Sequence, residues 1–337
     1  MRPVLFASIA FCAGCTILNS LDGVVGSQDD LDAGHPDAFP HDVTSADARA
    51  SDAGKKDAPD SDVGAGDARG DDDDGPPPDD AAPTGPQPIY TGLISPLGIT
   101  VHDADLCWVA GDTPRGVFCA PKGGGAASAI KRLDRPDDPF LVGAFDVVVD
   151  DTYVYWSNGS HNQVVRLKLS GGSAEEYFTG TGRISFLAIQ GSKIFASDCP
   201  ESGSQPKGNI VVGPASGKMS TLIFPSEPTA SGVGVSSNSV YWGTNNPNAL
   251  AFGLQTGNVP VTRVPMAGSV AGLAVDTQGV AYVLVSAQTI YRLDVGSISP
   301  VKIYDAGAPF GLSDLAVDDS FVYWSEHDAN RIMRMPK

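Results

Sequence analysis

The chain has 337 residues and a formal net charge of −18, with 40 acidic against 22 basic residues. The acidity is concentrated in the first 86 residues, which hold 18 acidic and 5 basic residues. Because no basic patch is present to meet phosphates, nucleic acid is excluded as a partner. The shift in composition near residue 86 also separates two kinds of sequence along the chain.

The first 15 residues combine one basic residue with a short apolar stretch, Val4–Phe11, and end in the sequence CAGC. Eight apolar residues are too few for a permanent membrane span, which needs about 20. The segment resembles a bacterial lipoprotein signal, in which cleavage precedes Cys15 and this cysteine is lipidated. An ordinary secretory signal is the alternative. Since Thr16 and not aspartate follows the cysteine, we expect a cell-envelope lipoprotein of the outer membrane, attached through Cys15.

Residues 16–86 consist mainly of Asp, Ala, Gly and Pro, with few large apolar side chains. Aspartate recurs every five positions from Asp32 to Asp72, a period that fits neither helix nor strand. So little apolar surface cannot offset the entropy of ordering, and the segment is predicted to be disordered. A coil of ~70 residues spans roughly 45 Å. We therefore expect a linker that holds the next domain away from the membrane.

Residues 87–337 contain six copies of one pattern: an apolar run, a short polar turn, then a β-branched and aromatic run. This order predicts a two-stranded hairpin. The clearest copies are VVVDDTYVYWS at residues 147–157 and LAVDDSFVYWS at residues 315–325. The copies align without gaps and place one residue of each, at spacings of 48, 40, 46, 40 and 42, in a single column: Trp108, Trp156, Ala196, Trp242, Tyr282 and Trp324. Such a period indicates a solenoid or a propeller.

Further runs after most copies supply a third and a fourth strand, as in VVRLKL at residues 164–169 and VKIYDAG at residues 301–307. Six units of four strands predict an all-β fold, a six-bladed β-propeller. The first run of each unit is almost entirely apolar, as expected for a strand that surrounds a central channel. A β-sandwich is the alternative, but it would not require six copies of one register.

The sixth unit ends after its third strand, at Lys337, which would leave an open sheet edge. The sequence QPIYTGL at residues 87–93 matches the fourth strand of the fifth unit at its Ile-Tyr pair. We therefore predict that this N-terminal strand completes the last blade and closes the ring.

The positions around the aromatic column read Tyr-Trp-Ser-Asn from Tyr155, Tyr-Trp-Gly-Thr from Tyr241 and Tyr-Trp-Ser-Glu from Tyr323. They resemble the six-bladed propellers of the low-density-lipoprotein-receptor type, named for a Tyr-Trp-Thr-Asp repeat, and more loosely the NHL-type propellers. No copy carries the full motif, and only Asp198 keeps the acid. The resemblance implies a propeller with a binding or scaffolding function, although a few related rings are lactonase-like or lyase-like enzymes.

Two acids, Asp146 and Asp314, occupy the same repeat position at the start of the innermost strand, where the other units have Gly or Phe. Propeller lactonases are similar in setting carboxylates around a channel cation, and these oxygens suit a hard ion such as calcium. The alternative, which we favour, is that each Asp caps backbone amides of its neighbouring turn. Because the equivalent positions offer no third acid, we expect no bound cofactor and treat calcium as the ion to test.

The loops between the second and third strands open on one rim and are polar and rich in asparagine. Amide side chains offer both donors and acceptors, which suits sugars or peptide backbones. Tight turns also demand Asn, so a purely structural role is the alternative. The candidate binding residues are Asn158, Asn162, Asn245, Asn246 and Asn330.

Cys107 and Cys119 stand on either side of a turn centred on Thr113, so they are expected to face each other across neighbouring strands. Export permits a disulfide between them. Two buried reduced cysteines are the alternative.

Motifs for catalysis are missing from the sequence, which has no G-x-S-x-G elbow, no H-E-x-x-H and no dinucleotide fingerprint. We therefore predict a monomeric, non-catalytic binding or scaffold protein, attached to the membrane by its lipid, with a glycan, peptide or protein as ligand. The alternative is a calcium-dependent lactonase-like or lyase-like propeller enzyme.

Overall fold

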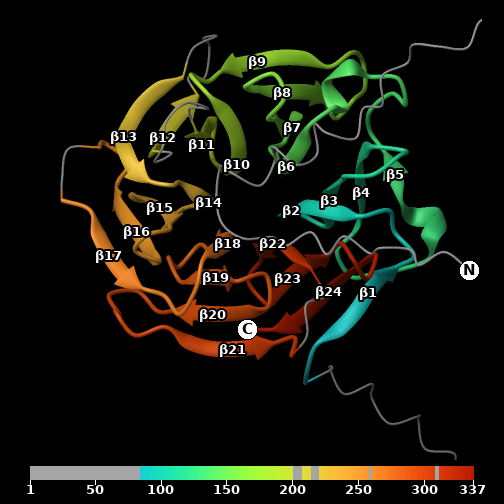
Figure 1. The fold of residues 1–337 in the computed structure, drawn as a ribbon. Coiled ribbons are helices and arrows are strands. Elements are labelled where there is room, and N and C mark those ends of the chain that lie inside the picture. The colour runs from blue at the N-terminus through green and yellow to red at the C-terminus, as the bar shows by residue number, and fades with distance from the viewer. Residues whose placement is uncertain (1–83, 200–206, 214–219, 258–259, 308–310) are drawn as a thin grey trace, which may run out of the picture. The chain divides into compact units, whose positions relative to one another are not determined.

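The computed structural model describes residues 84–337, apart from 200–206, 214–219, 258–259 and 308–310. The strands in this part form six four-stranded antiparallel sheets, arranged as the blades of a β-propeller (Figure 1). The predicted fold is thus confirmed. The predicted lipidation signal, with Cys15, and nearly all of the predicted linker lie outside the described residues. No helix of the described part is long and apolar enough to cross a membrane.

The first three blades follow one another along the chain, each from its innermost strand outward. Blade 1 contains β2 (Pro96–His102), β3 (Asp105–Ala110), β4 (Gly116–Pro121) and β5 (Lys131–Arg132). Two 3₁₀ turns, Ala127–Ala129 and Pro139–Leu141, flank β5. Blade 2 contains β6 (Ala144–Val149), β7 (Tyr153–Asn158), β8 (Gln163–Lys168) and β9 (Glu175–Thr179). Blade 3 contains β10 (Arg183–Gln190), β11 (Lys193–Cys199), β12 (Lys207–Gly213) and β13 (Thr221–Pro228).

The other three blades continue the same order, and the last takes its outer strand from the beginning of the domain. Blade 4 contains β14 (Ser231–Val235), β15 (Ser239–Thr244), β16 (Ala249–Leu254) and β17 (Thr262–Pro265). Blade 5 contains β18 (Val270–Val275), β19 (Ala281–Val285), β20 (Thr289–Leu293) and β21 (Val301–Asp305). Blade 6 contains β22 (Leu312–Val317), β23 (Phe321–Glu326), β24 (Arg331–Pro336) and β1 (Gln87–Thr91).

The aromatic column of the repeat fills the space between neighbouring blades. Trp156 of blade 2 is fully buried in a cluster with Val109 and Val117 of blade 1. Trp242 of blade 4 packs on Phe224 of blade 3, with ring centroids 4.6 Å apart. Each buried aromatic removes about 150–250 Å² from water, so a column with an aromatic in five of the six units supplies much of the adhesion between units.

The closing strand forms as predicted. β1 pairs antiparallel with β24, and Tyr90 stands opposite Ile332. The Tyr90 hydroxyl also donates to the Pro121 carbonyl in blade 1 at 2.7 Å, and its ring lies 6.0 Å from that of Trp108. This one strand therefore joins blade 6 to blade 1 by both main-chain and side-chain contacts.

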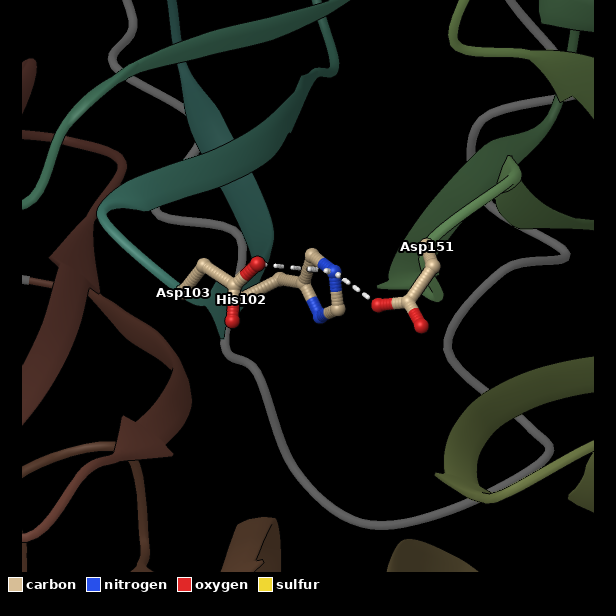
Figure 2. Close-up of side chains that lie close together, drawn as sticks. All are labelled: His102, Asp103 and Asp151. Atoms are coloured by element: carbon tan, nitrogen blue, oxygen red, sulfur yellow. Dashed lines mark ion pairs between the residues drawn. The ribbon is translucent and has the colours of Figure 1, made fainter.

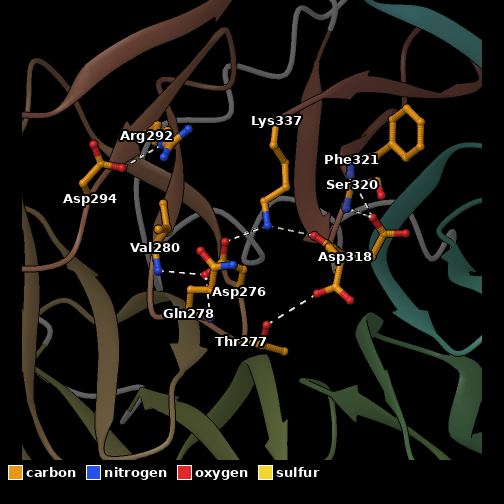
Figure 3. A network of polar contacts seen from close by, with 11 residues as sticks. Asp276, Thr277, Gln278, Val280, Arg292, Asp294, Asp318, Ser320, Phe321 and Lys337 are labelled. Atoms are coloured by element: carbon orange, nitrogen blue, oxygen red, sulfur yellow. Dashed lines mark hydrogen bonds and ion pairs between the residues drawn. The ribbon is translucent and has the colours of Figure 1, made fainter. Parts of the chain in front are cut away.

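A second tie joins blades 5 and 6 at the end of the ring that holds the turns between first and second strands. Lys337 extends its ammonium group between two of these turns, 2.7 Å from an Asp276 carboxylate oxygen and 3.0 Å from the Asp318 carbonyl (Figure 3). Thr277 of the same blade 5 turn donates to Asp319 of blade 6 at 3.4 Å. Adjacent turns on this end, here called the turn face, are thus in polar contact.

The first aspartate of the repeat shapes these turns. In blade 2, one oxygen of Asp150 accepts the backbone N–H groups of Thr152 and Tyr153, both at 2.7 Å. Its other oxygen accepts the Tyr155 hydroxyl at 2.8 Å. Blade 6 repeats this arrangement with Asp318 and Tyr323. Aspartate and tyrosine at this spacing therefore act as a pair that fixes the hairpin.

Candidate functional site

The central channel contains a cavity of about 170 Å³ lined by the innermost strands of all six blades. Most of its lining residues are Val, Leu, Ile or Ala, and every blade contributes at least two of them. Asp146 and Asp314 are the two carboxyl groups in this lining. Since Ala144 pairs with Asn158 at the far end of β7, both acids lie near the end of the channel where the second-to-third-strand loops open. This end is called the loop face below.

Both acids link neighbouring blades by hydrogen bonds. The two oxygens of Asp146 accept the backbone N–H of Val147, in its own strand, at 2.7 Å and that of Leu187, in blade 3, at 2.6 Å. Asp314 accepts the N–H of Ile99 in blade 1 at 3.2 Å. From the sequence we expected each Asp to cap backbone amides of its neighbouring turn. In the structure each Asp also accepts a backbone N–H from the next blade. The position is therefore used to join consecutive inner strands.

Glycine at the same repeat position makes room for these acids. A Cβ on Gly98 would lie 2.5 Å from an Asp146 carboxylate oxygen, and one on Gly272 would lie 2.9 Å from an Asp314 oxygen. Both distances are too short for real contacts. The backbone of the neighbouring strand is equally close, with Asp146 Cα 2.4 Å from a Cβ on Gly98 and Asp314 Cα 3.0 Å from one on Gly272, so both glycines allow the inner strands to approach.

Burial changes the protonation of this pair. Desolvation raises the pKa of Asp146 to about 7, although the hydrogen bonds from Leu187, Val147 and Asp314 oppose the rise. Desolvation and then the charge of Asp146 raise the pKa of Asp314 well above its ordinary value. The two carboxyls influence each other's titration, and because burial raises both pKa values the pair retains protons near neutral pH.

The donor set does not fit a calcium ion. Calcium takes 6–8 oxygen ligands, whereas the described channel lining offers two carboxyl groups among mostly apolar side chains. The oxygens of Asp146 already accept backbone hydrogens. We therefore derive no chemistry from a metal in the channel.

The predicted binding asparagines divide into two groups. Asn158 is fully buried, and its amide donates to the Phe140 carbonyl at 3.0 Å while its oxygen accepts from the His161 backbone at 3.2 Å. The Asn330 oxygen accepts from the Ser95 backbone at 2.9 Å. Asn246 is exposed in a left-handed turn conformation, with φ of 58°. These three positions are explained by the turns that contain them.

Asn162 has the same left-handed turn conformation as Asn246, with φ of 57°, but Asn162 and Asn245 differ from this group in their hydrogen bonding. Within the described part of the chain, both amide atoms of Asn245 and the amide oxygen of Asn162 are buried without a hydrogen-bond partner. The amide oxygen of Gln163 and the hydroxyl of Ser185 share this condition. The Asn245 side chain belongs to a residue that is only 9% exposed. Buried polar groups are paired in the great majority of cases, so each exception calls for an explanation.

These unpaired groups follow one another around the loop face. Asn162 and Gln163 belong to the blade 2 loop, which packs against the start of blade 3, because a Cβ on Gly159 would lie 3.2 Å from the Arg183 side chain. Ser185 lies in that start of blade 3. The blade 4 loop is joined to blade 3 by a bond from the Asn245 backbone N–H to the Pro228 carbonyl at 3.1 Å. The groups are here called the blade 2–4 polar rim.

A serine, a histidine and an aspartate also meet on the loop face of blade 6. The Ser313 hydroxyl lies 3.0 Å from Nδ1 of His327, whose Nε2 lies 2.8 Å from an Asp328 oxygen. Nδ1 is only 2.6 Å from the Gly311 carbonyl, which can only accept, so this nitrogen carries a hydrogen. It therefore has no lone pair for the serine proton, and the arrangement is not a nucleophile and its base.

A disulfide joins Cys107 and Cys119 in the structure, at directly opposite positions of β3 and β4 with Cα atoms 4.1 Å apart. It ties the second and third strands of blade 1 on the side of the sheet that packs in the cluster with Trp156.

Comparison with known proteins adds evidence on the fold. No protein-family model matches the chain, and no curated protein sequence matches it. The calcium-binding protein regucalcin from Agrobacterium tumefaciens is similar in structure, with a TM-score of 0.58 and 12% identity over 74% of this chain and 92% of that one. Virginiamycin B lyase from Staphylococcus aureus has a TM-score of 0.53 and 15% identity over 75% and 84%. A chain of a nidogen/laminin complex has a TM-score of 0.54 and 16% identity over 66% and 86%. At these identities the likeness concerns the propeller fold alone.

Proposed function

We propose that this protein is a lipid-anchored envelope protein whose propeller binds a neutral polar ligand, a glycan or a peptide, on the blade 2–4 polar rim. The observation that carries the proposal is the set of buried, unpaired amide and hydroxyl atoms of Asn162, Gln163, Ser185 and Asn245. A buried polar group without a hydrogen-bond partner costs about 1–3 kcal/mol in desolvation free energy. A ligand that formed hydrogen bonds with these groups would recover this cost.

The chemistry of the rim defines the ligand class. The unpaired groups are an amide N–H₂, three amide oxygens and a hydroxyl, all neutral. Hydroxyl groups of sugars and the N–H and C=O groups of a peptide offer the matching donors and acceptors. A metal ion would need carboxylate ligands that this set does not contain.

The binding site is tested with glycan and peptide arrays probed by the full chain. We expect binding that is lost on changing Asn162 to Gly, which keeps the left-handed turn at that residue, and Asn245 to Ala. The matched control is Asn238→Ala, because Asn238 is an exposed asparagine in a blade 4 turn on the opposite face. Equal array signals from the wild type and the double variant would reject the rim as the site.

The anchor is tested separately, by partition in Triton X-114 after expression in a host that processes lipoproteins. The protein is expected in the detergent phase, and Cys15→Ser is expected to move it to the aqueous phase. Aqueous partition of the unmutated chain would reject lipidation while leaving the rim proposal intact.

A propeller enzyme is the second candidate, because two of the structures that resemble this chain are described as a lyase and a calcium-binding protein. A screen on lactones, esters and cyclic peptides, with and without calcium, tests it. Calcium-dependent turnover that is abolished by Asp146→Ala or Asp314→Ala would replace the binding proposal with this one.

A further inference from the structure

Three side chains on the turn face converge on one point between blades 1 and 2. His102 ends β2, Asp103 follows it in the turn, and Asp151 lies in the equivalent turn of blade 2 (Figure 2). His102 Nε2 lies 3.2 Å from an Asp151 oxygen and 3.7 Å from an Asp103 oxygen. One ligand atom from each residue falls within 4.8 Å of the other two.

Blade 1 lacks the aspartate–tyrosine pair of blades 2 and 6 at both of its positions. His102 occupies the repeat position of Asp150 and Asp318, which elsewhere bind the turn and a tyrosine hydroxyl. The tyrosine position is taken in blade 1 by Cys107, which is used in the disulfide. Blade 1 thus lacks both halves of the pair that fixes the equivalent hairpins, and the ring of His102 points instead toward the blade 2 turn (Figure 2).

A hydrogen bond accounts for only one of the two contacts. An imidazole has at most one hydrogen on Nε2, which can point at the Asp151 oxygen at 3.2 Å, while the Asp103 oxygen at 3.7 Å approaches the same nitrogen. A metal ion on the Nε2 lone pair would bind both. In a tetrahedral zinc site, with bonds of about 2.0–2.2 Å, neighbouring ligand atoms are about 3.3 Å apart. The two measured separations bracket this value.

We infer that His102, Asp103 and Asp151 form a binding site for a transition-metal dication, with zinc as the preferred ion. One imidazole nitrogen and two carboxylate oxygens leave a fourth position for water, as in open zinc sites. Two carboxylate groups supply too few oxygen ligands for calcium, which takes 6–8. Because Asp151 belongs to blade 2 and the other two residues to blade 1, the ion joins these blades on the turn face, opposite the blade 2–4 polar rim.

The test is calorimetric titration of the full chain with zinc chloride. Since the aspartates of residues 16–86 also offer carboxylates, the result is the difference between each variant and the wild type. We expect His102→Ala to remove one site, and Asp151→Asn to weaken that site at least tenfold. The matched control is Asp319→Asn, because Asp319 holds the Asp151 position in blade 6 but faces a threonine hydroxyl. It should leave the titration unchanged.

Two further readouts keep the result independent of folding defects. Cobalt should give visible d–d absorption whose difference between wild type and His102→Ala corresponds to one bound ion. Zinc should raise the melting temperature of the wild type more than that of either site variant. Identical zinc titrations for the wild type and His102→Ala, or for the wild type and Asp151→Asn, would overturn the site.

Discussion

Two groups of buried polar side chains lie near the loop face, and they differ in how their hydrogen-bonding atoms are used. Asp146 and Asp314 in the channel receive backbone N–H groups from two consecutive blades. Asn162 and Asn245 on the rim keep amide atoms without a partner among the described residues. Both groups look alike in sequence, as polar residues at blade ends. Pairing of their atoms therefore separates side chains that hold neighbouring blades together from side chains whose hydrogen-bonding groups have no partner among the described residues.

The largest effect on stability is expected from removal of the closing strand β1, which, like the channel acids, joins neighbouring blades. A chain that begins at Ser95 lacks β1, so β24 loses its outer partner and Tyr90 no longer contacts blade 1. We expect loss of cooperative unfolding, measured by urea titration of tryptophan fluorescence. A chain that begins at Pro86 is the control. If both chains unfolded alike, the strand would not lock the ring.

This part of the fold was predictable because the information is local and repeated. Six aligned copies predict the blades, and the Ile-Tyr pair of residues 89 and 90 identifies the missing strand. The two-residue β5 was not anticipated, because KR at Lys131–Arg132 has no apolar or β-branched pattern.

The next effect concerns the disulfide of blade 1. The 12-residue separation of Cys107 and Cys119 closes a short loop, for which chain entropy gives about 3 kcal/mol. Changing both cysteines to serine should lower the free energy of unfolding by roughly this amount, as measured by chemical denaturation. Alkylation without reductant that labels both cysteines of the native protein would contradict the bond itself.

A somewhat smaller loss is expected for the channel acids. Asp146→Ala leaves the N–H groups of Val147 and Leu187 buried without their acceptor, at a cost of about 2 kcal/mol in unfolding free energy. Asp314→Ala should behave alike, and Asp319→Ala, on an exposed turn, should cost little. Ligand binding at the rim should persist in all three. An unchanged unfolding free energy for Asp146→Ala would show that the hydrogen bonds of Asp146 do not stabilise the fold.

The same pair gives a pH dependence with a definite sign. Burial raises the pKa of Asp146 to about 7, so the folded state binds more protons than the unfolded state above the ordinary carboxyl pKa of about 3.9. This contribution to stability is complete at low pH and is lost as the pH rises toward 7. The stability difference between the wild type and Asp146→Asn should therefore shift against the wild type from pH 4.5 to 8. A difference independent of pH would contradict the raised pKa of Asp146.

Less of the candidate site than of the fold could be read from the sequence. Asn158 and Asn162 lie in one loop and are chemically identical, yet only the surroundings show that the first is used by the turn. The contact of His102 with Asp151 joins residues of different blades and appears only once the ring is closed. The signal available beforehand was the replacement of Asp by His, together with the loss of the tyrosine at Cys107.

The smallest effect on stability, and the most direct test of the central claim, is expected for Asn162→Gly combined with Asn245→Ala, since glycine keeps the left-handed turn of residue 162, with φ of 57°. Because these amides make few internal bonds, the melting temperature should stay within about 2 °C of the wild type, which corresponds to about 0.5–1 kcal/mol. Affinity for the ligand found on the arrays, measured by calorimetry, should fall at least tenfold. Unchanged affinity, or a loss of affinity matched by a large fall in melting temperature, would contradict the account.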